Sequence, residues 1–297
     1  MAFEPPERLV RALGERSEDA PAQWLRELPA LAREALDRRG LTAQRVQAPG
    51  GRSSLVVLVR YSDGTPATLK LAPPCAAPGD ELAALAHWGG FGAVRVLDTR
   101  HDDDALLLER LQPEVSLRSL PEAKALLEAC GTIRRLWVAP PPGHSFETVA
   151  ERSARQAEPM SKAPEEAQPL VRQALAVRDE LAVLPPEELL LHGAFRQGKV
   201  LAGDRAPWLT VGPEPLVGER AYDLARLVRD RLEDQLASST GAAGAKRRVN
   251  RLADSLEVDR DRLRGWTLFR AVESGTRALA AGRRRDAEML LEFGSWL

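Results

Sequence analysis

The sequence predicts an α+β protein in which a small sheet precedes a larger group of helices. Two β-rich runs flank Asp63-Gly64 within residues 53–74, a pattern typical of a β-hairpin. From residue 119 onward, apolar residues recur at helical spacing, as in "SLPEAKALLEACGTIRRLWV". We therefore expect a sheet-containing lobe over residues 1–112, a helical lobe over residues 113–297, and a ligand site in the cleft between them.

Three further patterns define the first lobe. Residues 21–40 carry apolar side chains at helical spacing and finish at Gly40, which predicts an amphipathic helix. Residues 78–90 predict a second helix, closed by its final pair of glycines. Residues 93–111 predict two strands joined by an acidic turn, Asp102 to Asp104.

The second lobe alternates between helical and irregular segments. Residues 140–146, "PPPGHSF", predict a rigid connector, and residues 188–218 alternate strand and loop patterns. Residues 220–237 and 260–282 return to helical spacing. Between them, the sequence "SSTGAAGAK" over residues 238–246 predicts a flexible link.

Composition and charge exclude several classes of protein. The formal net charge of -1 gives no field that would attract nucleic acid, and the one short basic cluster, Arg283 to Arg285, is typical of a solvated helix end. No apolar run approaches the roughly 20 residues that span a bilayer. The four histidines are far apart in the chain, which argues against zinc. The N-terminus lacks a signal-peptide pattern and there are two cysteines, so we expect a cytoplasmic protein.

A glycine-rich segment, "APGGRSS", precedes the predicted hairpin. Gly50 and Gly51 permit a tight loop, and Ser53 adds a hydroxyl just before the strand. These residues suit a loop that covers phosphate groups. A Gly-Gly pair is more commonly only a turn, so both interpretations remain open.

Six segments occur in an order that matches a known family: "LAALAHWGGFGAVRVLD", "ALLLERL", "LLLHG", "PLVG", "AYDLA" and "GWTLFRAV". On these motifs the chain resembles the aminoglycoside phosphotransferases, and among them the streptomycin 6-kinases. The resemblance implies a protein-kinase-like fold of two lobes. It also implies transfer of the γ-phosphoryl group of a nucleotide to a hydroxyl group of an antibiotic.

The resemblance assigns nucleotide-binding roles to four residues of the first lobe. Lys70, in "TLKL", matches the lysine that contacts the nucleotide phosphates, and Glu81 matches the glutamate that pairs with it. Glu109 and Leu111 lie in "LERL", which matches the hinge that meets the adenine through backbone groups. For each residue alone, an ordinary surface or core role is the simpler interpretation.

The catalytic segment departs from the family pattern at three positions. The family reads HGDLHxGN where this chain reads "HGAFRQGK", so Ala194 replaces the catalytic acid and Lys199 replaces a metal-binding asparagine. Downstream, Gly212 replaces the second metal ligand, an aspartate. Magnesium prefers oxygen ligands, which these residues lack. We therefore expect no catalytic residue and no metal, and we expect Lys199 to act as a cation near the phosphates of any bound nucleotide.

Three nearby acids are alternative candidates. Glu214 and Glu219 follow the lost aspartate and could replace it, but a displaced carboxylate loses its placement, so we expect both to be loop charges in water. Asp223, in "AYDLA", is expected to cap the start of a helix rather than to act as a base.

These features give two main hypotheses for function, beside a third in which the chain is a chaperone-like partner that binds a natural-product precursor peptide. The first is a pseudokinase, a regulatory module that binds a small-molecule or peptide ligand, or a protein partner, and accepts ATP or another nucleotide without magnesium. The alternative is an ATP-dependent phosphotransferase acting on a hydroxyl group of a small molecule, or another reaction in the same cleft. Arg277 and Arg283 to Arg285 disfavour a cationic aminoglycoside as the ligand.

Overall fold

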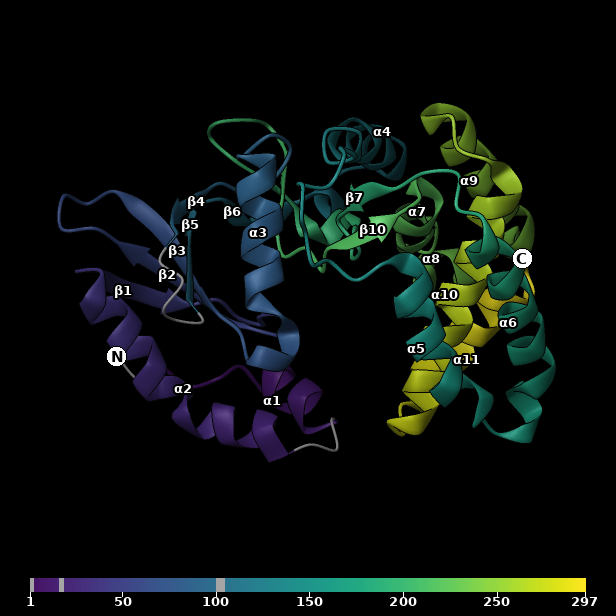
Figure 1. The fold of residues 1–297 in the computed structure, drawn as a ribbon, viewed down its shortest axis with the longest axis horizontal. Helices are drawn as coiled ribbons and strands as arrows, with labels where there is room; N and C mark the ends of the chain where they lie inside the picture. Colours follow the sequence, from purple (N-terminus) through teal and green to yellow (C-terminus); the bar gives the residue numbers. More distant parts are fainter. Residues whose placement is uncertain (1–2, 16–18, 100–104) are drawn as a thin grey trace. The chain divides into compact units, whose positions relative to one another are not determined.

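The computed structural model describes residues 3–15, 19–99 and 105–297 (Figure 1). The chain forms two compact units: the first comprises Met1–Ser119 with Val200–Gly212, and the second comprises Leu120–Lys199 with Pro213–Leu297. The first unit therefore extends beyond residue 112 and also includes a later segment of the chain. A single boundary in the sequence cannot separate the two units.

An antiparallel five-stranded sheet forms the centre of the first unit, with strand order β1-β2-β3-β5-β4. The strands are β1 (Thr42–Val46), β2 (Leu55–Arg60), β3 (Pro66–Leu71), β4 (Val96–Asp98) and β5 (Ala105–Glu109). The predicted hairpin is confirmed, because β2 and β3 pair on either side of Gly64, whose φ is 86°. The predicted strands β4 and β5 also pair, and the acidic turn predicted at Asp102 to Asp104 lies outside the described residues.

Helices cover the two faces of this sheet differently. The helices α1 (Glu7–Gly14) and α2 (Asp19–Arg38) lie along one face of the sheet (Figure 1). Their buried leucines belong to the same core cluster as Leu55 of β2 and Leu69 of β3. Because strand side chains alternate, Lys70 projects from the opposite face, where α3 (Pro78–Trp88) lies. Both predicted helices are confirmed, and α1 and β1 were not predicted.

A second, three-stranded sheet completes the first unit. It contains β6 (Gln112–Ser116), β8 (Val200–Ala202) and β9 (Leu209–Thr210), in the order β6-β8-β9. Thr210 also contacts the segment between α3 and β4, because its backbone N–H donates to the Gly92 carbonyl at 2.9 Å. These contacts explain why residues 200–212 belong to the first unit.

The second unit is mainly helical, and α10 (Arg260–Ala280) is its central element (Figure 1). The other elements are α4 (Glu122–Ile133), α5 (Val149–Ser161), α6 (Gln168–Val183), β7 (Leu189–Leu191), β10 (Leu216–Gly218), α7 (Arg220–Val228), α8 (Leu232–Ala237), α9 (Gly241–Leu256) and α11 (Arg284–Ser295). The α6 and α10 helices approach closely at Gly265, where an added Cβ would lie 2.7 Å from the Val177 Cγ1 atom. The α+β prediction is thus confirmed, since the first unit contains the sheets and the second is mainly helical.

The flexible link predicted at residues 238–246 is wrong, because α9 begins at Gly241. A Cβ on Gly241 would lie 2.7 Å from the Cη2 atom of Trp296. The glycine therefore permits close packing under an indole ring, a role that a glycine-rich sequence does not distinguish from flexibility. Within the described residues, no helix has the length and apolar character needed to cross a bilayer.

Candidate functional site

The buried pair Lys70–Glu81 is the first component of the candidate site. Lys70 projects from β3 and Glu81 stands in the first turn of α3, and the two side chains form an ion pair. Their side chains retain 11% and 4% of their exposure, so water screens the pair weakly. The second carboxylate oxygen of Glu81 is buried without a hydrogen-bond partner among the described residues. The pair implied by the family pattern is therefore formed, with one oxygen still unsatisfied.

The predicted phosphate loop connects β1 to β2. Gly50 has a φ of 71°, and an added Cβ would lie 2.9 Å from the Pro6 Cγ atom, so this position requires glycine. Gly51 has no atom within 3.4 Å of an added Cβ, its nearest neighbours being Ser54 atoms at 3.8 Å. Ser53 is half-buried. The turn is thus explained by packing, and a role in covering phosphates stays a prediction.

The predicted hinge follows β5. The carboxylate of Glu109 accepts the Arg95 backbone N–H at 2.7 Å and pairs with Arg205 at 2.6 Å. Arg110 donates to the Val59 carbonyl at 2.8 Å, and Leu111 is buried. All of these contacts stay within the first unit. Contact of Glu109 or Leu111 with a nucleotide stays a prediction.

In the second unit, the segment from His192 to Lys199 follows β7 and is held by Asp223. The Asp223 carboxylate accepts the backbone N–H groups of His192 and Gly193, each at 2.9 Å, and the Trp137 Nε1–H at 3.3 Å. Burial raises the pKa of Asp223, and the N–H groups of His192 and Gly193 oppose that change. The helix cap predicted for Asp223 is wrong, because its carboxylate faces the loop and not the N–H groups of α7.

A second anchor fixes the other end of the same loop. The Asp230 carboxylate accepts the Gln197 backbone N–H at 2.5 Å, and Arg231 Nε donates to Gln197 Oε1 at 2.8 Å. Arg231 also donates to the Leu120 carbonyl at 2.7 Å. The sequence analysis did not identify this contact. A second acid, two helical turns after Asp223, was the signal that could have identified it.

At the three positions where the sequence analysis expects catalytic groups to be missing, the side chains are a methyl group, an ammonium-bearing chain and a hydrogen. Ala194 is fully buried, and its N–H donates to His192 Nδ1 at 3.3 Å. The Lys199 side chain is 16% exposed, and its Nζ lies 3.6 Å from Glu214 Oε1. Gly212 has a φ of 60°, which favours glycine. Magnesium does not fit this donor set, and no three histidine, cysteine or acidic side chains gather as a metal site within the described residues.

The two acids considered as replacements have defined partners. Glu219 is buried, pairs with Arg262 and accepts the Trp266 Nε1–H at 2.7 Å, so the expectation of a solvated loop charge is wrong for it. Glu214 keeps 51% of its side-chain exposure but pairs with Lys199. Glu219 is therefore a core residue, and Glu214 is held beside the loop.

The arginines predicted to disfavour a cationic ligand are also paired. Arg277 contacts Glu273 at 3.1 Å and Arg283 contacts Asp286 at 3.0 Å. Arg284 and Arg285 are exposed in the first turn of α11. The charge at Arg277 and Arg283 is thus largely compensated.

A model of the family described as aminoglycoside/hydroxyurea antibiotic resistance kinase matches residues 39–282. A streptomycin 6-kinase of Streptomyces glaucescens is 34% identical over 276 residues, which cover 89% of this chain and 86% of that protein. A hydroxyurea phosphotransferase of Kitasatospora aureofaciens is 33% identical, with coverage of 92% and 81%. The resemblance to streptomycin 6-kinases is confirmed.

Solved structures support the fold. The aminoglycoside phosphotransferase APH(4)-Ia aligns with a TM-score of 0.63 at 16% identity, covering 90% of this chain and 96% of that one. An amicoumacin kinase solved with AMP-PNP and Ca²⁺ aligns with a TM-score of 0.65 at 11% identity, covering 91% and 94%. The kinase-like fold implied by the sequence motifs is confirmed.

Proposed function

Because the chain belongs to the aminoglycoside/hydroxyurea antibiotic resistance kinase family, we propose that it is a binding module that keeps the family's fold without magnesium-dependent phosphoryl transfer. The carrying observation is the residue set Ala194, Lys199 and Gly212. Relative to the family pattern, these residues remove two carboxylates and add an ammonium, a change of +3 in charge. Phosphoryl transfer depends on charge neutralisation by metal ions and on an acid that orients the acceptor hydroxyl.

The surroundings of the loop support this proposal. A replacement acid would need a free carboxylate that reaches the position of the lost one. Glu219 is committed to Arg262 and Trp266, and the Glu214 carboxylate is drawn to Lys199. A metal ion at Lys199 would also meet the repulsion of an ammonium.

The first unit suggests what is still bound. Lys70 is positioned by the buried Glu81 and offers a donor to an anionic ligand. We infer that ATP or another nucleotide binds without magnesium, with Lys199 as an additional cation. A small-molecule or peptide ligand, or a protein partner, would then bind to the nucleotide-bound protein in a bacterial cytoplasm.

An ATP-dependent phosphotransferase that acts on a hydroxyl group of a small molecule is the second candidate. It is favoured by the comparisons, since proteins named as streptomycin 6-kinase and hydroxyurea phosphotransferase align over most of the chain at 33–34% identity. It is also favoured by the intact Lys70–Glu81 pair. The residues of the loop favour the first candidate instead.

A transfer assay separates the two candidates. The purified chain is incubated with γ-labelled ATP, magnesium, and streptomycin or hydroxyurea, and a streptomycin 6-kinase serves as the positive control. The proposal predicts no labelled product above the level of a Lys70→Met variant. Magnesium-dependent product that is lost in Lys70→Met would establish the phosphotransferase instead.

A further inference from the structure

A groove runs between α4 and α9, which both lie in the upper part of the second unit in Figure 1. It holds a cavity of about 360 Å³. Its apolar lining includes the buried Leu126 of α4 and Leu252 of α9, and the half-buried Cys130. The α4–α9 groove is defined by these residues together with Leu127, Gly131, Arg134 and Arg251.

Two positions on α4 leave this groove open to solvent. Leu127 lines the groove and is 69% exposed. Gly131, one helical turn later, is exposed, and beyond its own helix an added Cβ would meet no described atom within 4 Å. Glycine lowers helix stability relative to alanine, and packing within the described chain does not require it at this position. A side chain from outside therefore has room to approach the backbone of α4 at Gly131.

Unpaired cations border the apolar lining. Arg134, directly after α4, and Arg251 of α9 both line the groove, and Arg247 precedes Arg251 by one helical turn. All three are exposed, and within residues 3–15, 19–99 and 105–297 none has a carboxylate at ion-pair distance. Arg134 donates to the Ser255 carbonyl, which is a neutral acceptor. The groove is thus apolar inside and basic at its rim.

The acids of the same two helices do not neutralise this rim. Glu122 of α4 pairs with Arg248, and Asp254 of α9 pairs with Arg260 at 2.5 Å. Glu128 of α4 does not line the groove. The carboxylates of α4 and α9 are therefore held elsewhere or face another surface.

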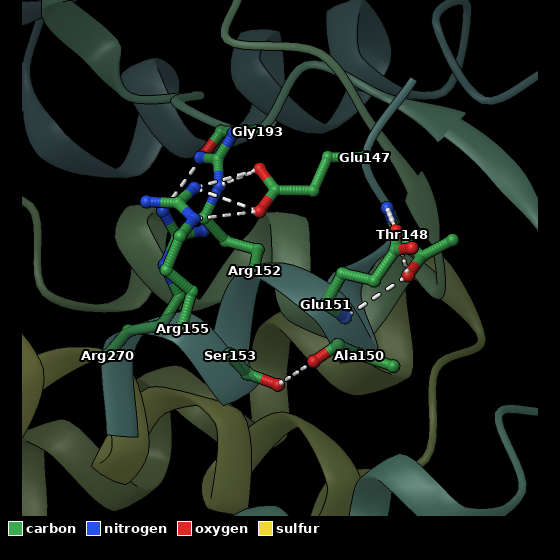
Figure 2. A network of polar contacts seen from close by, with 9 residues as sticks. All are labelled: Glu147, Thr148, Ala150, Glu151, Arg152, Ser153, Arg155, Gly193 and Arg270. Atoms are coloured by element: carbon green, nitrogen blue, oxygen red, sulfur yellow. Dashed lines mark hydrogen bonds and ion pairs between the residues drawn. The ribbon is translucent and has the colours of Figure 1, made fainter. Parts of the chain in front are cut away.

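Arginines in other parts of the second unit do have acidic partners. Figure 2 shows Glu147 between Arg152 and Arg155, and the Arg155 Nη2 atom lies 2.8 Å from the Glu147 carboxylate. Arg262 pairs with Glu219 in the same way. The rim of the α4–α9 groove lacks such partners, so a bound acidic segment would supply them.

The basic character of the surface ends at Arg134. This residue also lines a neighbouring cavity of about 630 Å³, where Glu188 and Glu257 are exposed. Like charges repel, so an acidic segment is favoured along α4 and α9 and disfavoured beyond Arg134.

We propose that the α4–α9 groove binds an acidic amphipathic helix of a protein partner. Such a helix places apolar side chains on one face, which suits the lining around Leu126 and Leu252, and its flanking acids would meet Arg134 and Arg251. A third helix packed between α4 and α9 would also cover Leu127. This assignment rests on the proposed function, in which a protein partner binds the chain, and it names the surface and the chemistry of that partner.

Fluorescence anisotropy with a labelled synthetic peptide tests the groove on the full chain. The probe is a peptide of about 14 residues built from leucine, glutamate and alanine, with its leucines on one helical face. A second peptide carries lysine in place of each glutamate. We expect the acidic peptide to bind at least about tenfold more tightly than the lysine peptide, and its binding to weaken as the salt concentration rises.

Three variants locate the binding surface. Leu127→Gln, Gly131→Gln and Arg251→Glu should each weaken binding of the acidic peptide by about tenfold. Gly131→Gln should leave the melting temperature unchanged or raised, because glutamine is a better helix former than glycine, so its weaker binding would not reflect loss of the fold. Arg172→Glu changes an exposed arginine of α6, outside the groove, and as the matched control should leave binding unchanged.

The assay contains no nucleotide, so its outcome is independent of the phosphoryl-transfer assay: a chain that transfers phosphate can still bind the peptide, and an inactive chain can fail to bind it. Modification of Cys130 by a maleimide, in a Cys75→Ser background, should be slowed by the acidic peptide and not by the lysine peptide. The proposal is overturned if the acidic peptide binds no more tightly than the lysine peptide, if the three groove variants bind it as Arg172→Glu does, or if the parent forms a dimer that Leu127→Gln dissociates.

Discussion

Lys70 with Glu81 in the first unit and the loop from His192 to Lys199 in the second were both assigned from one family pattern, yet they differ in what they keep. The first keeps its charged side chains and their buried contact. The second has backbone anchors, since Asp223 and Asp230 accept the N–H groups of the loop, while Ala194 and Lys199 stand where we expect reactive side chains to be missing. The comparison teaches that different residues hold the backbone of the loop and supply its side-chain chemistry.

The largest expected effect comes from breaking the frame of the loop. Asp223→Ala leaves the N–H groups of His192 and Gly193 buried without an acceptor, so we expect a loss of about 3 kcal/mol or more in the free energy of unfolding. Urea unfolding measures this loss. Asp254→Ala removes an acid that is 57% exposed and should cost less than about 0.5 kcal/mol. Equal effects of the two substitutions would show that Asp223 does not anchor the loop.

The contact between Lys70 and Glu81 in the first unit is tested by a double-mutant cycle. Lys70→Met leaves the buried Glu81 carboxylate without its cation, and we expect a cost of about 3 kcal/mol. Adding Glu81→Leu should recover most of that cost, because the unpaired charge is removed. Nucleotide binding should remain absent in the double variant. Recovery of binding together with stability would show that Lys70 has no ligand role.

Substitutions at Gly212 test whether the backbone conformation at this position requires glycine. Its φ of 60° predicts that Gly212→Ala costs about 1 kcal/mol, whereas Gly212→Asn should cost less because asparagine tolerates this conformation. Gly79→Ala, in the open first turn of α3, should be neutral or slightly stabilising. Differential scanning calorimetry compares the three. An unchanged melting temperature in Gly212→Ala would mean that the backbone there does not depend on glycine.

The smallest effect is a pH dependence at Glu214. Its carboxyl pKa is lowered in the folded state, so its contribution to stability is present above the unfolded pKa of about 4.3 and is lost as pH falls below that value. The side chain is half-exposed, so solvent screening limits the effect to less than about 1 kcal/mol. Unfolding of the parent and of Glu214→Gln should differ at pH 6, and the difference should shrink progressively as the pH falls from about 5 toward about 2. A difference that stays constant over this range would point to packing and not to charge.

The sequence predicted most of the fold because apolar periodicity and glycine stops are local signals. The hairpin at Gly64 and the helix ending near Gly40 were found in this way. At Gly241 the same signal failed, since the contact with Trp296 joins residues far apart in the chain. The roles of Asp223 and Glu219 were also missed, because the donors that they accept from come from other elements.

Of the candidate site, the sequence predicted the residue types but not their partners. The pairing of Lys70 with Glu81 followed from the family pattern and was confirmed. The pairing of Lys199 with Glu214, and the hydrogen bond from Arg270 to the Gly193 carbonyl, arise where the segment before β10 and the helix α10 meet the loop. No local pattern connects these elements, so the charge balance of the loop emerges only in the folded chain.

The magnesium dependence of nucleotide binding tests the central claim most directly. Titration calorimetry with ATP compares the parent with a variant carrying Ala194→Asp, Lys199→Asn and Gly212→Asp, each in magnesium and in EDTA. The parent should bind ATP with the same affinity in both buffers, because the side chains of Ala194, Lys199 and Gly212 offer no oxygen ligands. The triple variant should bind at least about tenfold more tightly with magnesium. A parent protein that already binds ATP about tenfold more tightly with magnesium would contradict the account.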